Sequence, residues 1–280
     1  MNKLVAKMIK KTDYTSYCCL HVMASHRRNA LYAVGVFAKC VMDIVSSAEK
    51  IPQKIDLLNA WQQELDNIYQ NNAPTSQIGR DIFAILQNFN LPKSEFMMLL
   101  NSARNDLLNP PRGLSQQLYG KYCDERAGVF IRQVLRILGC NDEICINQLA
   151  NYLGKALQTT FFLRDIKDDA LNGRIYLPFD YLRDAGINSC NPMEIIVDNN
   201  LGKARDRLGK FAKNNFIKAF DLLNNLDKKT AFHLKMLVYP YKYCFDAMDS
   251  RGWEIITPKP DVTPFTKIML FFKAYMEKVF

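Results

Sequence analysis

The sequence predicts an all-α protein, and three observations carry that prediction. The 280 residues include only 12 glycines and 11 prolines, which favours long regular elements. Apolar residues recur with a period near 3.6 along most of the chain, whereas runs with the alternating pattern of half-buried strands are few. Hydrophobic residues make up 49% of the chain, enough for a sizeable core. We expect one domain that spans residues 1–280.

Capping residues and loop signals divide the first part of the chain into helices. Thr15 and Ser16 are good helix-capping residues, and residues 71–74 and 109–111, rich in asparagine and proline, predict loops. The helices expected from these signals cover residues 4–11, 15–26, 27–47, 54–69, 76–88 and 92–108.

The second part of the chain continues this helical pattern. A helix over residues 114–138 is expected to end at Gly139, and the helix that carries Leu153 to Asp169 ends at Asn172 and Gly173, because glycine favours the turn after a helix. The lysines and arginines of the next long helix, Arg205 among them, are expected on a solvated surface. The remaining expected elements are a short turn of helix at 178–185, a loop at 187–192, helices at 192–223, 228–252 and 266–280, and a linker at 258–264.

An acidic cluster, Asp165, Asp168 and Asp169, is the most informative feature of the chain. On a continuous helix the spacings of three and four residues place the three carboxylates on one face. Hard divalent cations prefer oxygen ligands, and Mg²⁺ takes one or two carboxylates together with water and substrate phosphate. The cluster therefore predicts a site where Mg²⁺ bridges the protein and a diphosphate.

The same DxxDD pattern alone is typical of a solvated acidic face, and its flanks argue against that alternative. Upstream, an apolar stripe at helical spacing indicates that much of this helix is buried. Arg164 precedes the cluster, and Arg174 and Tyr176 follow the turn at Asn172 and Gly173. A diphosphate held by a metal on one side and by guanidinium on the other fits this arrangement.

The charge balance favours an anionic partner. The chain carries 37 lysines and arginines against 28 acidic residues, a formal net charge of +9. Diphosphates, acidic membrane surfaces and nucleic acid all suit that balance. No nucleic-acid-binding motif accompanies it, so we expect no nucleic acid.

Targeting signals and cysteines point to the cytoplasm. The first residues lack the apolar stretch of a secretory signal, and nowhere do 18 apolar residues run together. The eight cysteines form no CxxC pair, which favours reduced thiols. We expect a soluble, cytoplasmic protein. Its last helix, 266–280, has an apolar side with lysines, and either packs on the body or makes a peripheral contact with an anionic membrane.

Residues 153–187, LGKALQTTFFLRDIKDDALNGRIYLPFDYLRDAGI, resemble the second aspartate-rich motif of the squalene/phytoene synthase family, QLTNILRDxxEDxxxGRIYLPxDxLxxxG. Within the family the chain looks most similar to bacterial presqualene diphosphate synthases. The resemblance implies an isoprenoid synthase fold of helices around a central cavity. It also implies that Asp165 and Asp169 bind Mg²⁺, that Asp168 supports them, and that Arg164 and Arg174 contact diphosphate.

Two further segments resemble the family. LYGKYCDERAGVFIRQVLRILG matches its YCxRVAGxVGxLxxRxFG helix at Tyr122, and the segment VYPYKYCFDAMDSRGWE resembles its C-terminal motif, which assigns Arg251 to diphosphate. Arg126 stands where the pattern has a small apolar residue, so it either turns outward or alters the prenyl tunnel. Ser16 is the nearest equivalent of the family's entrance serine, which meets a phosphate.

The first aspartate-rich motif of the family, YAxYAFCRxVDDIVDE, is only partly retained in residues 27–47. Asp43 keeps the middle acidic position and Lys39 replaces the arginine, so the resemblance implies a metal ligand at Asp43 and a diphosphate contact at Lys39. Neutral residues replace the other motif side chains. These departures are Gly35, Met42 and Ser46, with Phe161 in place of an asparagine in the second motif.

The resemblance implies an enzyme of isoprenoid biosynthesis, in a hopanoid or carotenoid pathway. Its expected reaction is the head-to-head condensation of two prenyl diphosphates, with farnesyl diphosphate as the expected substrate, to presqualene diphosphate, squalene or a phytoene-type product. Mg²⁺, or Mn²⁺ in its place, is the expected cofactor, and NADPH use stays open. Asp165 and Asp169 are the expected catalytic residues, and Tyr122 and Tyr176 line or close the site.

The eroded first motif motivates a second hypothesis, in which the chain has lost catalysis. It would then serve as an assembly or interaction protein, like the family's relatives in respiratory complex I assembly, with a partner protein. A third possibility lies between the two, a prenyl-diphosphate binder without turnover.

Overall fold

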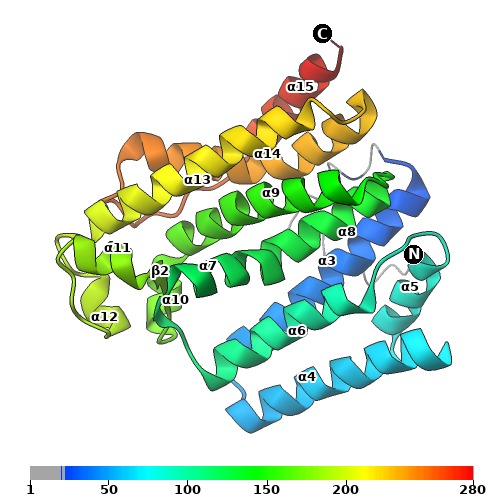
Figure 1. The fold of residues 1–280 in the computed structure, drawn as a ribbon, viewed down its shortest axis with the longest axis horizontal. Coiled ribbons are helices and arrows are strands. Elements are labelled where there is room, and N and C mark those ends of the chain that lie inside the picture. Colours follow the sequence, from blue (N-terminus) through cyan, green and yellow to red (C-terminus); the bar gives the residue numbers. More distant parts are fainter. Residues whose placement is uncertain (1–19, 21–22, 280) are drawn as a thin grey trace. The chain divides into compact units, whose positions relative to one another are not determined.

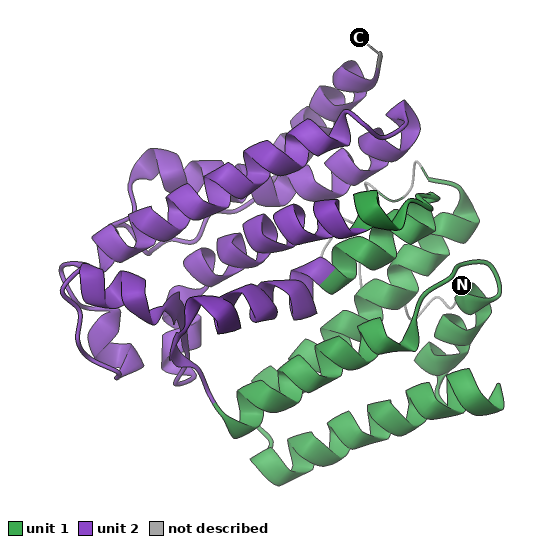
Figure 2. Cartoon of the chain, in the orientation of Figure 1, with its two compact units in different colours: residues 1–109, 129–146 green, residues 110–128, 147–280 purple. Residues whose placement is uncertain are grey.

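A computed structural model describes residue 20 and residues 23–279 of the chain (Figure 1). The helix expected at 4–11, most of the one at 15–26, and Ser16 lie outside these residues. The described part of the chain divides into two compact units (Figure 2). Of the described residues, those up to 109 and 129–146 belong to unit 1, and residues 110–128 and 147–279 belong to unit 2. The single domain expected from the sequence stays a prediction.

Unit 1 is built around helix α3, Ser25–Ser46, which packs against several neighbouring helices. Phe37 of α3 shows this packing, because its ring makes edge contacts with Trp61 and Phe96 at centroid distances of 5.2 and 5.1 Å. The other helices of the unit are α4 (Ile51–Asp66), the π-helical turn η1 (Asn67–Asn71), α5 (Gln77–Leu86), α6 (Lys93–Leu108), α8 (Val129–Leu138) and the first turn of α9 (Glu143–Arg164).

Helix α3 is the one helix among the described residues with the length and composition to cross a membrane. Of its most apolar 18-residue window, 56% is buried inside the structure. The same apolar pattern is expected of a helix at the centre of a packed unit. Length and composition alone therefore do not assign α3 to a membrane.

Unit 2 is helical apart from one short strand pair that the sequence did not predict. Strand β1 (Arg112–Leu114) pairs in parallel with β2 (Ile175–Pro178), and Ile175 donates its backbone N–H to Pro111 O at 2.7 Å. Runs this short show too little alternation to be recognised. The helices of unit 2 are α7 (Gln116–Cys123), the π-helical turn η2 (Asp124–Gly128), the rest of α9, α10 (Ile166–Leu171), α11 (Phe179–Asp184), α12 (Pro192–Ile195), α13 (Leu201–Leu223), α14 (Lys228–Arg251) and α15 (Pro264–Val279).

The uniform helix predicted for residues 114–138 is wrong in its middle, because residues 124–128 form the π-helical turn η2. This wider turn coincides with a very close approach of two backbones. A Cβ atom on Gly154 of α9 would lie 2.7 Å from Gly128 Cα, which no side chain tolerates. Glycine at position 154 therefore lets η2 lie directly on α9, next to the tyrosine at the end of α7.

Most other expected elements are confirmed. Gly139 and Gly173 have φ values of +97° and +73° at the predicted helix ends, the region that favours glycine. The helix expected at 192–223 exists as α12 and α13, and the expected helix at 228–252 is α14. The described cysteines are free thiols, as expected.

Candidate active site

Asp165 interrupts the helix that was expected to carry all three aspartates. Helix α9 ends at Arg164 and α10 begins at Ile166, while Asp165 has φ −98° and ψ 7°. Backbone hydrogen bonds still cross the break, from Asp165 N to Phe161 O (2.8 Å) and from Asp169 N to Asp165 O (2.9 Å). The expectation of one continuous helix face is therefore wrong, although these two hydrogen bonds link the two helices.

A local ion pair gives the physical reason for this break. Arg164 Nη2 donates to Asp165 Oδ2 at 2.7 Å and its Nε donates to Oδ1 at 3.0 Å. Consecutive side chains on a regular helix point about 100° apart, so neighbours cannot pair in this way. The kink at Asp165 turns its carboxylate back onto the guanidinium.

The carboxylates of Asp165 and Asp168 converge on one cation, the ammonium group of Lys259. Lys259 Nζ donates to Asp165 Oδ1 at 2.6 Å and to Asp168 Oδ2 at 2.5 Å. Lys259 belongs to the linker between α14 and α15, and our sequence analysis missed it. The only local signal is its position between two prolines, Pro258 and Pro260, in a segment with no helical period. The contact shows that a single positive charge can lie between the two carboxylates.

These groups hold one another in their charged forms. Burial raises the pKa of Asp165, but the hydrogen bonds and positive charges of Arg164 and Lys259 outweigh that effect and keep the pKa below its ordinary value. Burial lowers the pKa of Lys259, yet Asp165 and Asp168 raise it above its ordinary value. Asp165 and Lys259 are therefore both charged at neutral pH, as a cation site at Asp165 requires.

Arg174 places a second cation after the same helix. Its backbone N–H donates to Asp169 O at 2.9 Å, so the chain doubles back through Gly173 toward α10. The Nε of Arg174 is buried and has no hydrogen-bond acceptor. A buried guanidinium donor without an acceptor is costly unless a ligand accepts from it. Arg174 is therefore suited to bind an anion.

Aromatic rings from α7, α9 and β2 stack beside this cluster. Tyr176 stacks on Phe162 with ring centroids 4.2 Å apart and makes an edge contact with Tyr122 at 5.8 Å. The guanidinium carbon of Arg126 lies 4.9 Å from the Tyr122 ring centroid and 5.2 Å from that of Tyr176. Arg126 is buried, so the alternative in which it turns outward is wrong; the two ring faces attract and shield its charge.

Three other predicted diphosphate or metal residues have partners within the protein. In unit 1, Lys39 Nζ lies 2.7 Å from both carboxylate oxygens of Asp43. In unit 2, Arg251 donates to the backbone carbonyls of Pro258 and of Ile255, the latter at 3.2 Å. Arg251 thus holds the linker immediately before Lys259. The predicted ligand roles of Lys39, Asp43 and Arg251 stay predictions.

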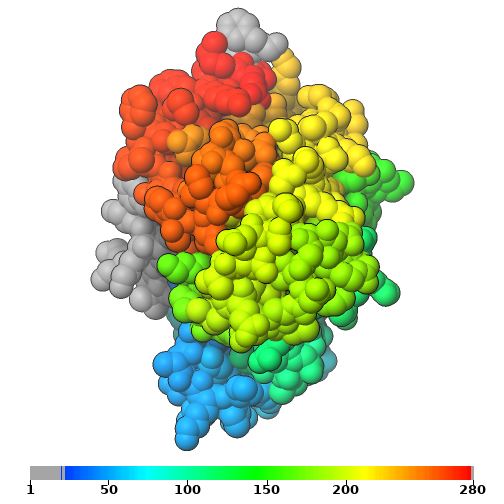
Figure 3. Space-filling model, turned by 90° about the vertical axis from the view of Figure 1, so that its left-hand side faces the viewer, coloured from blue at the N-terminus to red at the C-terminus, as the bar shows by residue number. Residues whose placement is uncertain are grey.

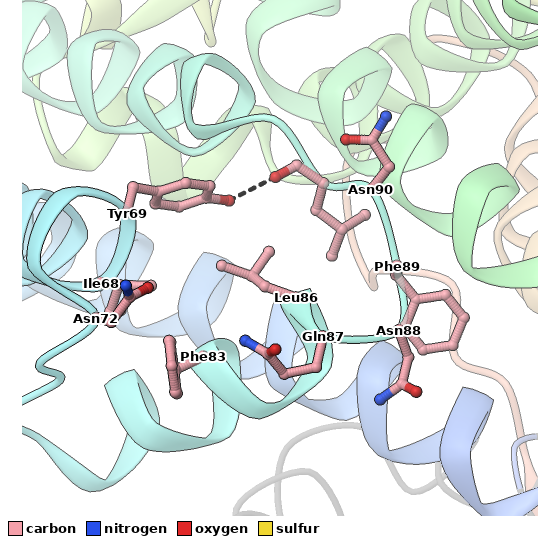
Figure 4. A pocket seen from close by; sticks show the side chains of 10 residues that line it. Ile68, Tyr69, Asn72, Phe83, Leu86, Gln87, Asn88, Phe89 and Asn90 are labelled. Carbon is pink, nitrogen blue, oxygen red and sulfur yellow. Dashed lines mark hydrogen bonds between the residues drawn. The ribbon is translucent and has the colours of Figure 1, made fainter.

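A pocket in unit 1, unlike the acidic cluster, is lined by uncharged side chains (Figure 4). It has a volume of about 460 Å³ and lies between η1 and the segment after α5. Tyr69 donates its hydroxyl to Leu91 O at 2.5 Å across one side, and the rest of the lining is apolar or amide. None of its lining residues is charged and none is a predicted site residue. It is therefore unsuited to a diphosphate.

The donor chemistry of the acidic cluster fits Mg²⁺ or Mn²⁺. Asp165 and Asp168 each offer a carboxylate oxygen to one cation, and Mg²⁺ usually takes only one or two protein carboxylates. Asp169 does not complete a set of three: among the described residues, no three His, Cys, Asp or Glu side chains are grouped to hold a metal ion. Metal binding by Asp169 stays a prediction.

Comparison with known proteins places the chain in a family. The sequence model of squalene/phytoene synthase matches residues 9–266. The chain belongs to this family. Presqualene diphosphate synthase of Sinorhizobium fredii is 29% identical over 257 residues, which cover 92% of this chain and 91% of that protein. The enzyme of the same name from Rhodopseudomonas palustris is 27% identical and covers 85% of this chain and 84% of its own length. The predicted family and enzyme class, a prenyltransferase, are thereby confirmed.

Solved structures confirm the predicted fold. A dehydrosqualene synthase matches with a TM-score of 0.86 and 20% identity over 98% of this chain and 95% of its own. A squalene synthase from Alicyclobacillus acidocaldarius matches with a TM-score of 0.77 and 22% identity, over 89% of this chain and 93% of its own. The chain therefore has the isoprenoid synthase fold of this family.

The position of Lys259 leads to a first prediction. In the absence of diphosphate, Lys259→Gln is expected to increase Mn²⁺ affinity about tenfold, because the ammonium group no longer competes for the carboxylates. Mn²⁺ titration followed by electron paramagnetic resonance measures the change. Lys210→Gln, which removes an exposed lysine paired with Asp206, serves as the control and leaves the affinity unchanged. Unchanged or weaker Mn²⁺ binding in Lys259→Gln would show that Lys259 and the metal do not share this site.

Proposed function

We propose that this prenyltransferase condenses two molecules of farnesyl diphosphate head to head to presqualene diphosphate, in a reaction that depends on Mg²⁺. The observation that carries the proposal is the convergence of Asp165 and Asp168 on one cation. Arg174, with its buried and unpaired Nε, lies just beyond the same helix. Family membership supports the reaction type, and the names of the relatives support the product.

In the proposed site the protein's own cations bind the substrate diphosphate. Arg174 Nε would donate to a phosphate oxygen, and Lys259 Nζ, which lies beside the same carboxylates, would offer a second positive charge to the diphosphate. Asp165 and Asp168 would hold the Mg²⁺, whose charge would help to neutralise the leaving diphosphate. A leaving group with more of its charge neutralised departs at a lower barrier.

The aromatic cluster would protect the allylic cation. The stacked rings of Phe162 and Tyr176 present faces of negative quadrupole and exclude water. Tyr122 supports them through its edge contact with Tyr176. Joining two allylic diphosphates in this way releases one diphosphate and one proton, so the proposed reaction needs no reductant such as NADPH.

The test is single-turnover incubation of the purified protein with labelled farnesyl diphosphate and Mg²⁺, with and without EDTA. We expect release of pyrophosphate and a thirty-carbon product, and expect EDTA to abolish both because the metal is removed. A sample given EDTA and then excess Mg²⁺ controls for damage to the protein and should regain activity.

Other outcomes would favour the alternatives. Diphosphate binding without turnover would support a prenyl-diphosphate binder. The first motif favours that alternative, because its one remaining acidic residue, Asp43, already forms an ion pair with Lys39. Neither binding nor turnover in a folded protein would support an assembly or interaction protein. The proposed product joins a thirty-carbon apolar skeleton to a diphosphate, so the proposal also includes peripheral contact of the protein with a membrane.

A further inference from the structure

Helix α15 has two apolar faces, and only one of them is covered. Towards α14 it buries a narrow stripe, Thr266, Leu270 and Ala274. The opposite side exposes six large apolar side chains: Phe265, Ile268, Met269, Phe272, Tyr275 and Met276. Phe265 is 77% exposed and Phe272 is 58% exposed. Figure 3 shows α15, in red, at the surface of the molecule.

The spacing of these six residues makes them one continuous surface, which we call the α15 stripe. The other five lie three, four, seven, ten and eleven residues after Phe265 in the sequence. At about 100° per residue they fall within an arc of about 120° along the whole helix. No charged residue lies within that arc. Single exposed apolar residues are ordinary, but a contiguous patch of this kind marks an interaction surface.

Basic groups border the α15 stripe, and its nearest acid is neutralised. Lys273 is exposed at one margin, with its Nζ 5.1 Å from the Tyr239 ring centroid. Lys278 lies towards the other margin, with its Nζ 4.9 Å from the Phe232 centroid. Glu277, the acidic residue of α15, accepts a hydrogen bond from Lys235 Nζ at 2.7 Å. The surface is therefore an apolar stripe with positive margins.

We propose that the α15 stripe docks on an anionic membrane surface, with the helix lying in the plane of the interface. An amphipathic helix of this kind inserts its apolar side chains at the headgroup boundary, while lysines at its margins meet anionic lipid. A second copy of this chain is a poorer partner, because both copies would bring the same lysines and the same net charge of +9. The proposal does not depend on catalysis and survives if the chain is only a binder.

Vesicle co-sedimentation tests the proposal. We expect the protein to bind vesicles of phosphatidylcholine with one quarter phosphatidylglycerol, and to bind pure phosphatidylcholine more weakly. Phe272→Asp is expected to lower the partition coefficient at least about tenfold, because it replaces an inserted ring with a charge. Lys273→Gln is expected to lower it about fivefold, and only on anionic vesicles. Ile217→Asp is the matched control: Ile217 is 54% exposed on a different helix, α13, and is not part of the stripe, so binding should stay unchanged.

A second measurement reports on orientation. In a Phe272→Trp variant, brominated lipids are expected to quench the added fluorescence, while the same lipids leave an Ile217→Trp variant unaffected. Light scattering tests the alternative in which a second copy of this chain, and not a membrane, covers the α15 stripe. A native dimer that Phe272→Asp converts to monomers, together with no vesicle binding by the native protein, would overturn the proposal in favour of a second copy. Equal vesicle binding by Phe272→Asp and the native protein would also overturn it.

Discussion

Asp165→Asn is expected to lower single-turnover release of pyrophosphate by about a thousandfold, the scale of losing a main electrostatic contact in a transition state. The substitution keeps the shape of the side chain and removes its charge. Asp165 contacts both Arg164 and Lys259, so neutralising it removes a charged partner from both cations and leaves Lys259 with Asp168 alone. Less negative charge remains to hold a divalent metal, and turnover should fail with it.

Asp206→Asn provides the matched control for this experiment. Asp206 is an aspartate on α13 whose partner is the exposed Lys210, and such surface pairs contribute little to stability. Turnover should therefore stay within about twofold of the native rate, the scale expected when only a surface pair is lost. Circular dichroism confirms that both variants are folded. Native turnover in a folded Asp165→Asn variant would show that the acidic cluster is not the site of the reaction.

The acidic cluster was predictable because its signal is local. Asp165 and Asp168 stand three residues apart, and flanking apolar residues and the glycine stop indicated a buried, terminated helix. The break at Asp165 was not predictable, because it depends on a side-chain pair with Arg164 that competes with regular helix geometry. Periodicity describes which residues share a face but not which neighbouring pair will distort the backbone.

Lys259 shows the limit of local patterns more clearly. It lies 94 residues from Asp165 in sequence and reaches it from an irregular linker. Irregular segments carry no period, so nothing in the sequence indicates where their side chains will lie. Most of the helices were predictable, because burial of one face dictates their spacing, whereas the π-helical turn η2 and the break at Asp165 were not. Nor were the two short strands.

Arg205 is a second residue whose position the local sequence pattern did not predict. It was expected on a solvated surface with the other basic residues of its helix, and that expectation is wrong: it is 1% exposed. Its guanidinium donates to the backbone carbonyls of Trp253, of Ile255 at 3.2 Å and of Leu163 at 3.2 Å. One buried side chain thus joins the end of α9, which precedes Asp165, to the linker that carries Lys259.

Replacing Arg205 by methionine is expected to lower the free energy of unfolding by about 3 kcal/mol. Two opposing contributions determine this change, the relief of a buried charge and the loss of hydrogen bonds. Burial lowers the pKa of Arg205 to about 10, so keeping its charge inside costs about 3 kcal/mol that methionine avoids. Methionine also leaves three carbonyls without their donor, and each hydrogen bond to a charged group contributes about 1.5–3 kcal/mol. The lost hydrogen bonds outweigh the relief of burial. Urea denaturation of the two proteins measures the difference.

Arg207→Met is the matched control, because Arg207 is two residues away on the same helix and pairs with Asp184 at the surface. Its loss should leave the stability nearly unchanged, because exposed ion pairs contribute little. If Arg205→Met were as stable as Arg207→Met, the three carbonyls would have to find water or other donors, and Arg205 would not fix the linker. If Arg205 does fix it, a folded Arg205→Met protein should also bind Mn²⁺ more tightly, as Lys259→Gln does. The linker would then be free to withdraw Lys259 from Asp165 and Asp168.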